Sequence, residues 1–217
     1  MVEVVPAVLV KSREELLEHI ARVRESVSVV HIDIMDNEFV PNKTIGLESL
    51  SELPDGISYE FHWMVKNPER WIAKINGNHL HLVHVETINK KNWEALTKIC
   101  VRSGCRLGLV LNPETSIEKL EPYIKEVSRV VVMAVHPGFY GQKYISDVEE
   151  KIRALRTGFP ELEVEVDGGV NPETAERACG AGANFLAAAS AVYSAKNPRE
   201  AIENISAAGR HGAGTGE

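Results

Sequence analysis

Cysteine is scarce in this chain. Three cysteines occur among 217 residues, at Cys100, Cys105 and Cys179. Their number is odd and their spacing fits no zinc-binding pattern, so the sequence predicts reduced thiols rather than a disulfide framework. Because thiols stay reduced in reducing compartments, we expect a cytoplasmic protein.

The chain has fewer basic than acidic residues, 24 against 31, and it also lacks long apolar runs. The formal net charge of -7 and the pI near 5.7 argue against nucleic acid or an anionic membrane as the main partner. The first residues, MVEVVPAVLVKS, carry an acid at Glu3 and lack the basic head and cleavage site of a signal peptide. Since no apolar run is long enough to span a bilayer, we expect neither a nucleic-acid nor a membrane partner.

The glycine-rich GxGxxG turn of dinucleotide-binding folds is missing after the first apolar run, which weakens that alternative. Instead, strand-like runs alternate with amphipathic stretches, eight of each, as in repeated βα units. This count in a chain of this length favours one closed (β/α)8 barrel over an open doubly wound sheet. Strands are expected at Val2 to Val10, Ser28 to Met35, Ser58 to Val65, His79 to Glu86, Arg106 to Leu111, Arg129 to Val135, Leu162 to Asp167 and Ala183 to Ala188.

The intervening stretches are read as helices, and the first opens with Ser12 and Glu15 at the spacing of a capping box. The expected ranges are Ser12 to Glu25, Gly46 to Glu52, Pro68 to Ile75, Lys90 to Ser103, Ser116 to Lys125, Ile145 to Gly158, Pro172 to Gly180 and Pro198 to Ala208. We therefore predict a single domain over residues 1–208. The glycine-rich segment 209–217 is expected to be a disordered tail.

The second strand carries charge where an apolar strand is expected. His31, Asp33 and Met35 share one face of VVHIDIM, while Val30 and Ile32 lie on the other. Both faces look buried, and burying an unpaired carboxylate is costly, so Asp33 needs a metal, a base or a reacting ligand beside it. This strand alone fits a core histidine next to a strand-end aspartate equally well.

Two further strands end in the same way. His62 and Met64 share a face of YEFHWMV, and Asp167 closes a strand just before the pair Gly168 and Gly169. In a barrel, the carboxyl ends of the strands meet at the face that carries the active site. His31, Asp33, His62 and Asp167 therefore predict a site for one divalent metal ion, with zinc, iron(II), manganese and cobalt as candidates.

Loops suited to an anion follow the last three strands. Glycine lets backbone N–H groups approach an anion closely, and the start of a helix adds a favourable dipole. Each loop alone is equally consistent with an ordinary βα turn, but the three together favour a phosphate site. Its candidate residues are Gly138, Phe139, Tyr140, Gly141, Gly168, Gly169, Ala189 and Ser190, with His62 close to the substrate.

The order of motifs resembles the ribulose-phosphate 3-epimerase family. The matching segments are HIDIMDNEFVPN, FHWMVKNP, HVET, LNPET, VVVMAVHPGFYGQ and VDGGVNPET. The resemblance implies a TIM barrel of the ribulose-phosphate-binding type, a ketose phosphate as substrate and a homo-oligomer. It implies that His31, Asp33, His62 and Asp167 hold one divalent metal, and that the two aspartates move the protons. Met35, Met64 and Met133 would form an apolar shelf beside the substrate, although they could equally be core filler.

The implied reaction explains these residue types. Epimerisation at C3 of a ketose phosphate removes a proton next to a carbonyl and returns it on the opposite face, through an enediolate. Asp33 and Asp167 would serve as the two bases, and a metal would stabilise the oxyanion as a Lewis acid. The substrate expected is D-ribulose 5-phosphate, converted to D-xylulose 5-phosphate in the pentose phosphate pathway.

Several positions depart from the pattern usual in that family. They are Ala7 in place of a serine, Asn37 and Tyr140 in place of glycines, His136 in place of an asparagine, and Ala189 in place of the glycine before Ser190. These changes leave room for a hexulose 6-phosphate such as allulose 6-phosphate, or for a non-catalytic sugar-phosphate-binding barrel. A phosphate-barrel decarboxylase is set aside because Met35 stands where such enzymes carry lysine. Glu60, Glu86 and Glu165 share the inward face, and the sequence does not identify what neutralises them.

Overall fold

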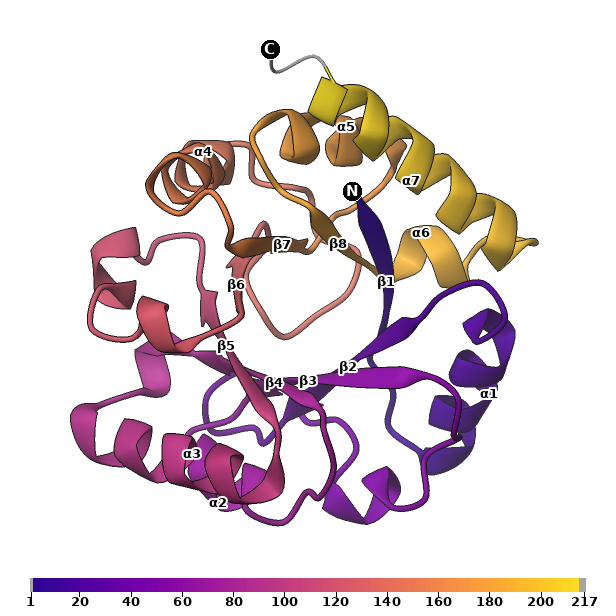
Figure 1. Ribbon diagram of the computed structural model, residues 1–217. Coiled ribbons are helices and arrows are strands. Elements are labelled where there is room, and N and C mark those ends of the chain that lie inside the picture. Colours follow the sequence, from indigo (N-terminus) through magenta and orange to yellow (C-terminus); the bar gives the residue numbers. More distant parts are fainter. Residues whose placement is uncertain (1, 215–217) are drawn as a thin grey trace.

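Eight parallel strands close into a barrel with helices outside, so the predicted (β/α)8 class is confirmed (Figure 1). The computed structural model describes residues 2–214. Each strand pairs with its neighbours in sequence, and β1 pairs with β8 to close the ring. The strands are β1 (Glu3–Val8), β2 (Val29–Met35), β3 (Ser58–Met64), β4 (Leu80–His84), β5 (Arg106–Leu111), β6 (Arg129–Met133), β7 (Glu163–Asp167) and β8 (Phe185–Ala188).

The outer layer mixes full helices with short 3₁₀ turns. The α-helices are α1 (Arg13–Val23), α2 (Pro68–Ile72), α3 (Lys90–Ser103), α4 (Val148–Gly158), α5 (Pro172–Gly180), α6 (Ser190–Tyr193) and α7 (Pro198–Gly214). The 3₁₀ turns are η1 (Leu47–Leu50), η2 (Val85–Thr87), η3 (Ile117–Leu120) and η4 (Ile124–Glu126). Helix starts follow local capping: the Ser12 hydroxyl accepts from the Glu15 N–H, and Asn89 and Asn171 open capping boxes.

Two expected helices are wrong, because the structure has only 3₁₀ turns there. The range Ser116 to Lys125 contains Pro122, which lacks an N–H and clashes with the preceding turn, so η3 and η4 form on either side of it. The range Gly46 to Glu52 forms η1, and the chain leaves this region through Glu52, whose φ of 52° is left-handed.

The expectation of a disordered tail is wrong for residues 209–214, because α7 continues to Gly214. Its glycines lie where the helix meets its neighbours. A Cβ on Gly209 would stand 2.9 Å from Val2 and 3.1 Å from the Cys179 sulfur, and a Cβ on Gly212 would collide with the Glu176 carbonyl of α5. Glycine here serves close packing of α7 rather than disorder. Residues 215–217 of the expected tail lie outside the described part of the chain.

The core has two parts, and strand alternation sorts residues between them. Outward residues such as Ile32, Ile34 and Trp63 pack under the helices, whereas Leu82, Val131 and their neighbours fill the barrel interior on the β4 to β6 side. On the β2, β3 and β7 side the interior is polar. The inward face of these strands therefore holds the buried polar side chains from which a catalytic site can be built.

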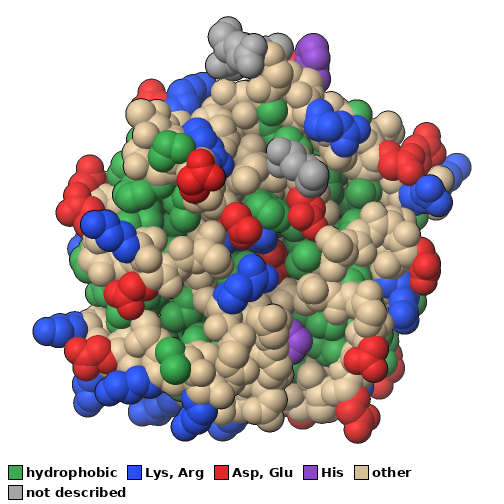
Figure 2. Space-filling model, viewed as in Figure 1, with side chains coloured by type: hydrophobic (Ala, Val, Ile, Leu, Met, Phe, Trp, Pro, Cys, Tyr) green, Lys and Arg blue, Asp and Glu red, His purple; other side chains and the backbone are tan. Residues whose placement is uncertain are grey.

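The surface carries charges of both signs. On the face drawn in Figure 2, acidic and basic side chains are interspersed over most of the rim. Within residues 2–214, none of the helices combines the length and the apolar character needed to cross a membrane.

Candidate active site

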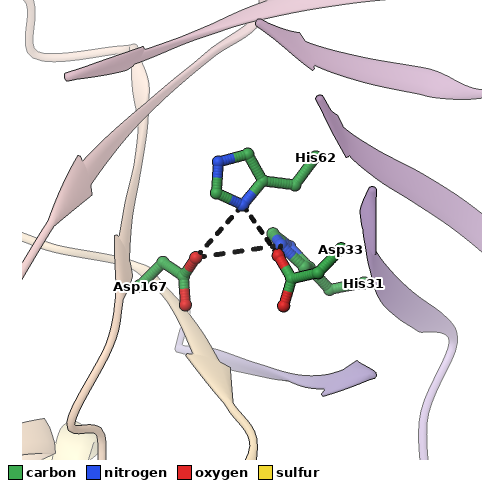
Figure 3. Close-up of side chains that lie close together, drawn as sticks. All are labelled: His31, Asp33, His62 and Asp167. Atoms are coloured by element: carbon green, nitrogen blue, oxygen red, sulfur yellow. Dashed lines mark hydrogen bonds and ion pairs between the residues drawn. The ribbon is translucent and has the colours of Figure 1, made fainter. Parts of the chain in front are cut away.

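Four side chains from three strands converge at the carboxyl end of the barrel (Figure 3). His31 and Asp33 come from β2, His62 from β3 and Asp167 from β7. Strand pairing sets Asp33 directly beside His62, while Asp167 ends β7. The structure thus brings together all four residues that the sequence singled out.

One nitrogen of each imidazole faces one oxygen of each carboxylate. The Nδ1 atom of His62 lies 2.9 Å from Asp33 Oδ1 and 3.3 Å from Asp167 Oδ2. The Nε2 atom of His31 lies 3.3 Å from Asp33 Oδ1 and 3.9 Å from Asp167 Oδ2. Asp33 and Asp167 approach from opposite sides, and their second oxygens point away from His62 (Figure 3).

This donor set fits a divalent metal ion. A four-coordinate ion with ligands at about 2.1 Å holds its ligand atoms about 3.4 Å apart, close to the four distances observed. His31 Nε2 is fully buried and has no hydrogen-bond partner among the described residues. A buried lone pair in that position is otherwise costly, so its geometry favours a cation at the centre of the four atoms.

Asp33 is held in its ionised form. Burial alone would raise its pKa, but hydrogen bonds and charge interactions with His31 and His62 outweigh burial and hold the pKa of Asp33 well below its usual range. The backbone around it is also fixed, because the Thr44 hydroxyl donates to the Asp33 carbonyl at 2.9 Å and accepts from the Met35 N–H. No sequence motif pointed to Thr44, which reaches β2 from the following loop.

A further histidine, His84, contacts His62 on the side away from the aspartates. The sequence alone did not assign it to the site. His84, at the end of β4, has its Nε2 atom 2.9 Å from His62 Nε2, and its Nδ1 lies 3.2 Å from Glu86 Oε2. The other Glu86 oxygen accepts from the Asn112 N–H at 2.9 Å. Glu86 thus has defined partners, which the sequence alone could not supply.

A small cavity lies above the four residues, and most of the predicted substrate-binding residues line it. Asp33 and Asp167 form its floor, while His31 and His62 lie below its surface. The expected shelf of Met35, Met64 and Met133 lines one wall. The expected phosphate residues Gly138, Phe139, Tyr140, Gly141, Gly168, Gly169, Ala189 and Ser190 line the rest.

Tyr140 lines this cavity. Its hydroxyl oxygen accepts a hydrogen bond of 2.5 Å from the Leu9 N–H, which ties the loop after β6 to the end of β1. The cavity measures about 60 Å³, room for a few water molecules. The hydrogen bond of Tyr140 to β1 therefore helps to shape the space above Asp33 and Asp167.

Two of the unusual residues have backbone angles that bear on their side chains. Ala189 has a negative φ of −100°, so it does not need the left-handed conformation that favours glycine. Asn37 has a φ of 63°, and asparagine is among the residues that tolerate the left-handed region. His136 is exposed, and its Nε2 lies 2.5 Å from Glu114 Oε1 on the neighbouring loop. Ala7 is buried and pairs with His31 across β1 and β2.

Comparison with known proteins identifies the family. A profile described as the ribulose-phosphate 3 epimerase family matches residues 3–193. The chain belongs to this family. The sequence-based identification is therefore confirmed, and the match spans β1 to α6 and so includes the whole site.

Curated relatives agree with the family. The chain is 37% identical over 190 residues to "Ribulose-phosphate 3-epimerase, cytoplasmic isoform" of Oryza sativa subsp. japonica, which covers 84% of this chain and 83% of the relative. It is 36% identical over 217 residues to "Ribulose-phosphate 3-epimerase" of Bacillus subtilis (strain 168), covering 94% and 98%. Epimerases are isomerases, so the prediction that the chain is an enzyme of this class is confirmed.

Solved structures agree on the fold. KGPDC from Streptococcus mutans superposes with a TM-score of 0.74 at 14% identity, covering 97% of this chain and 98% of that one. The 3-hexulose-6-phosphate synthase from Salmonella typhimurium gives 0.71 at 13% identity, covering 96% and 99%. At these identities the likeness concerns the barrel itself.

Proposed function

We propose that this member of the ribulose-phosphate 3-epimerase family interconverts D-ribulose 5-phosphate and D-xylulose 5-phosphate. The observation that carries the proposal is that Asp33 and Asp167 lie on opposite sides of the four-residue cluster and both line one cavity. Inverting a carbon centre through a planar enediolate requires a base on each face, and these two carboxylates supply them.

The two aspartates have one oxygen each available for proton transfer. In Asp33 the imidazoles contact Oδ1, and in Asp167 they contact Oδ2. The remaining oxygen of each carboxylate is left to accept a proton from C3 or return one to it. Asp33 takes the proton on one face, Asp167 delivers a proton on the other, and the roles reverse for the back reaction.

His31, Asp33, His62 and Asp167 would hold one divalent metal ion, zinc, iron(II), manganese or cobalt according to supply. When bound, the ion supplies a Lewis acid that stabilises the negative charge developing on the substrate oxygens. The proposal is supported by the ligand-like spacing of the four donor atoms and by the unpartnered His31 Nε2.

The loops after β6, β7 and β8 would bind the phosphate. Gly138, Gly141, Gly168 and Gly169 have positive φ values, which open their backbone to close approach. Ala189 has a negative φ and so does not need glycine at this position, and the N–H groups near Ser190 would remain available to the phosphate. Met35, Met64 and Met133 would cover the apolar edge of the sugar and keep water from the enediolate.

We further propose that the protein works in the cytoplasm, as the name of the rice relative states for that protein. The expected homo-oligomer remains a prediction. So does the expectation that neither nucleic acid nor a membrane is a partner.

The direct test incubates the metal-loaded protein with ribulose 5-phosphate in deuterated water. Formation of xylulose 5-phosphate with deuterium at C3 is the expected result. Turnover without label at C3 would contradict the proton-transfer mechanism. No turnover of ribulose 5-phosphate but turnover of allulose 6-phosphate would change the assigned substrate to a hexulose phosphate. No turnover of either would favour a binding role.

A further inference from the structure

A buried ionic layer lies directly beneath the four site residues. Glu60 on β3 and Glu165 on β7 are 1% and 0% exposed, and Arg129 on β6 is 4% exposed. Arg129 Nη1 donates to Glu60 Oε2 at 2.5 Å and to Glu165 Oε2 at 2.8 Å. The interior layers of such barrels are ordinarily filled by branched apolar residues, so charged groups here need an explanation.

The layer is anchored at the amino end of the barrel. Arg129 Nε donates to Glu163 Oε2 at 3.0 Å, and its guanidinium lies 3.6 Å from the centre of the Phe185 ring. These contacts hold the guanidinium plane in one orientation, with Nη1 placed between the Glu60 and Glu165 carboxylates. A buried network of this kind is rarely justified by stability alone, because desolvation offsets most of the Coulombic gain.

Both carboxylates turn their other oxygen toward His31. Glu60 Oε1 lies 2.6 Å from His31 Nδ1, and Glu165 Oε1 lies 3.4 Å from the same nitrogen. Because Arg129 occupies the two Oε2 atoms, the two Oε1 atoms are left for the imidazole. Two carboxyl oxygens beside one ring nitrogen can both accept from it, so the geometry favours a hydrogen on Nδ1 of His31.

This fixes the other ring nitrogen as well. With the hydrogen on Nδ1, the neutral ring presents a lone pair at Nε2, the atom that faces Asp33 and Asp167. A carboxylate behind an imidazole also makes the opposite nitrogen a stronger ligand. The layer therefore acts on the site through one ring, without contacting the cavity.

We propose that Glu60, Glu165 and Arg129 are positioning residues that hold His31 in the Nδ1–H form and thereby set the affinity of the site for a first-row divalent cation. The inference rests on the metal site of the proposed function. Its specific content is that the affinity depends on the carboxylates of the buried layer, and in particular on Glu60.

Glu60→Gln is the sharpest test. The glutamine amide must point its NH₂ group at either Arg129 or the His31 N–H, so one donor faces another in a buried site. We expect zinc affinity, measured by competition with a chromophoric chelator, to fall about 10- to 100-fold. Glu163→Gln is the matched control, because Glu163 also contacts Arg129 but does not touch His31; its zinc affinity should equal that of the wild type.

Nitrogen-edited NMR of the zinc-loaded protein gives a readout independent of activity. The His31 Nδ1–H proton, in a 2.6 Å hydrogen bond, should appear far downfield in the wild type and in Glu163→Gln. It should move upfield or exchange away in Glu60→Gln. A folded Glu60→Gln protein with wild-type zinc affinity and an unmoved signal would overturn the inference while leaving the proposed function intact.

Two further outcomes are decisive. If the wild-type protein binds no divalent cation, the metal part of the proposed function fails and this inference with it. If Glu60→Gln does not fold, Arg129→Lys decides, since a single ammonium keeps the charge but cannot contact Glu163 and also bridge Glu60 and Glu165 as the guanidinium does. We expect Arg129→Lys to weaken zinc binding, and unchanged binding would overturn the inference.

Discussion

The Nε2 atoms of His62 and His84 lie 2.9 Å apart inside the barrel. One ring must donate and the other accept, since two N–H groups cannot face each other. If His62 Nδ1 binds the proposed metal ion, its hydrogen belongs on Nε2, and His84 accepts it. His84 then carries its own hydrogen on Nδ1, where Glu86 accepts it. This chain orients His62 from behind, as Glu60 does for His31.

His84→Phe should therefore lower the metal affinity of the site, although His84 is not one of the four proposed ligands. The variant leaves the His62 Nε2 atom buried without its hydrogen-bond partner, which costs about 1–3 kcal/mol. We expect lower thermal stability of the metal-free protein and about a 10- to 100-fold loss of zinc affinity. His84→Gln, which retains an acceptor oxygen, is the control and should keep more of both. Equal zinc affinity in His84→Phe and wild type would contradict the role assigned to His84.

Removing either base should separate epimerisation from proton exchange. Asp33→Asn and Asp167→Asn keep the shape of the side chain but cannot accept a proton. Each should lose epimerisation about a thousandfold or more and keep the barrel fold. With zinc content verified, each variant should still exchange the C3 hydrogen of one substrate epimer with deuterated water, and the two variants should act on opposite epimers. Exchange of both epimers by one variant would argue against a base on each face.

The hydroxyl of Tyr140 should matter for substrate binding. Tyr140→Phe removes the acceptor for the Leu9 N–H and so loosens the loop that lines the cavity. A hydrogen bond of this kind contributes about 1 kcal/mol, so we expect KM to rise severalfold with kcat retained. Tyr144→Phe is a matched control, because the Tyr144 hydroxyl is buried without a hydrogen-bond partner among the described residues. Steady-state kinetics on both variants checks this; an unchanged KM in Tyr140→Phe would mean that this hydrogen bond does not affect substrate binding.

The glycines of α7 should be needed for stability rather than for catalysis. In Gly212→Ala the new methyl group meets the Glu176 carbonyl of α5, and overpacking of this kind costs about 1–3 kcal/mol. Gly158→Ala in α4 is the control, because a Cβ there meets nothing within 4 Å and alanine favours helix. Urea unfolding should show a lower midpoint for Gly212→Ala and an equal or higher one for Gly158→Ala. Similar midpoints in both would mean that α7 can shift away from α5.

Helix α7 shows which parts of the structure could not be predicted from the sequence. Period-two alternation placed His31, Asp33 and His62 on the inward faces of β2 and β3, where the structure has them, because successive side chains of a strand point to opposite faces. The position of Asp167 at a strand end before two glycines added the fourth residue of the cluster that the structure brings together. Glycine composition, by contrast, predicted disorder at 209–214, since its packing role depends on α5, a partner that the local sequence does not reveal.

The buried ionic layer and the contact between Tyr140 and Leu9 could not be predicted from the sequence for a similar reason. Arg129 stands first in its strand, and nothing local indicates that its side chain meets Glu60 and Glu165, carried by β3 and β7. Barrel closure creates that meeting. The contact of Tyr140 with Leu9 likewise joins residues 131 positions apart, and it depends on the conformation of a loop rather than on a periodic pattern.

Cys105 should be the reactive thiol of this chain. Its sulfur interacts most strongly with Cys100 and then with His81, and the Ser103 hydroxyl donates to it at 3.2 Å. Together they outweigh burial and hold the pKa of Cys105 below its usual range. Cys105 also lines a cavity of about 360 Å³ between α3 and β5, so a small reagent can reach it. Burial raises the pKa of the Cys179 thiol to about 12, which makes that residue unreactive.

Iodoacetamide at pH 7 should therefore label Cys105 first, as peptide mass spectrometry would reveal, and Cys179 only after unfolding. The pH dependence gives the sharper check. A free thiol below its pKa gains about tenfold in thiolate, and hence in rate, per pH unit, whereas a thiol already ionised gains nothing. The labelling rate of Cys105 should thus stay nearly flat from pH 7 to pH 8. Cys105→Ser should abolish the fast phase, and a tenfold rise in the rate for the wild type would show that the neighbouring donors do not ionise this thiol.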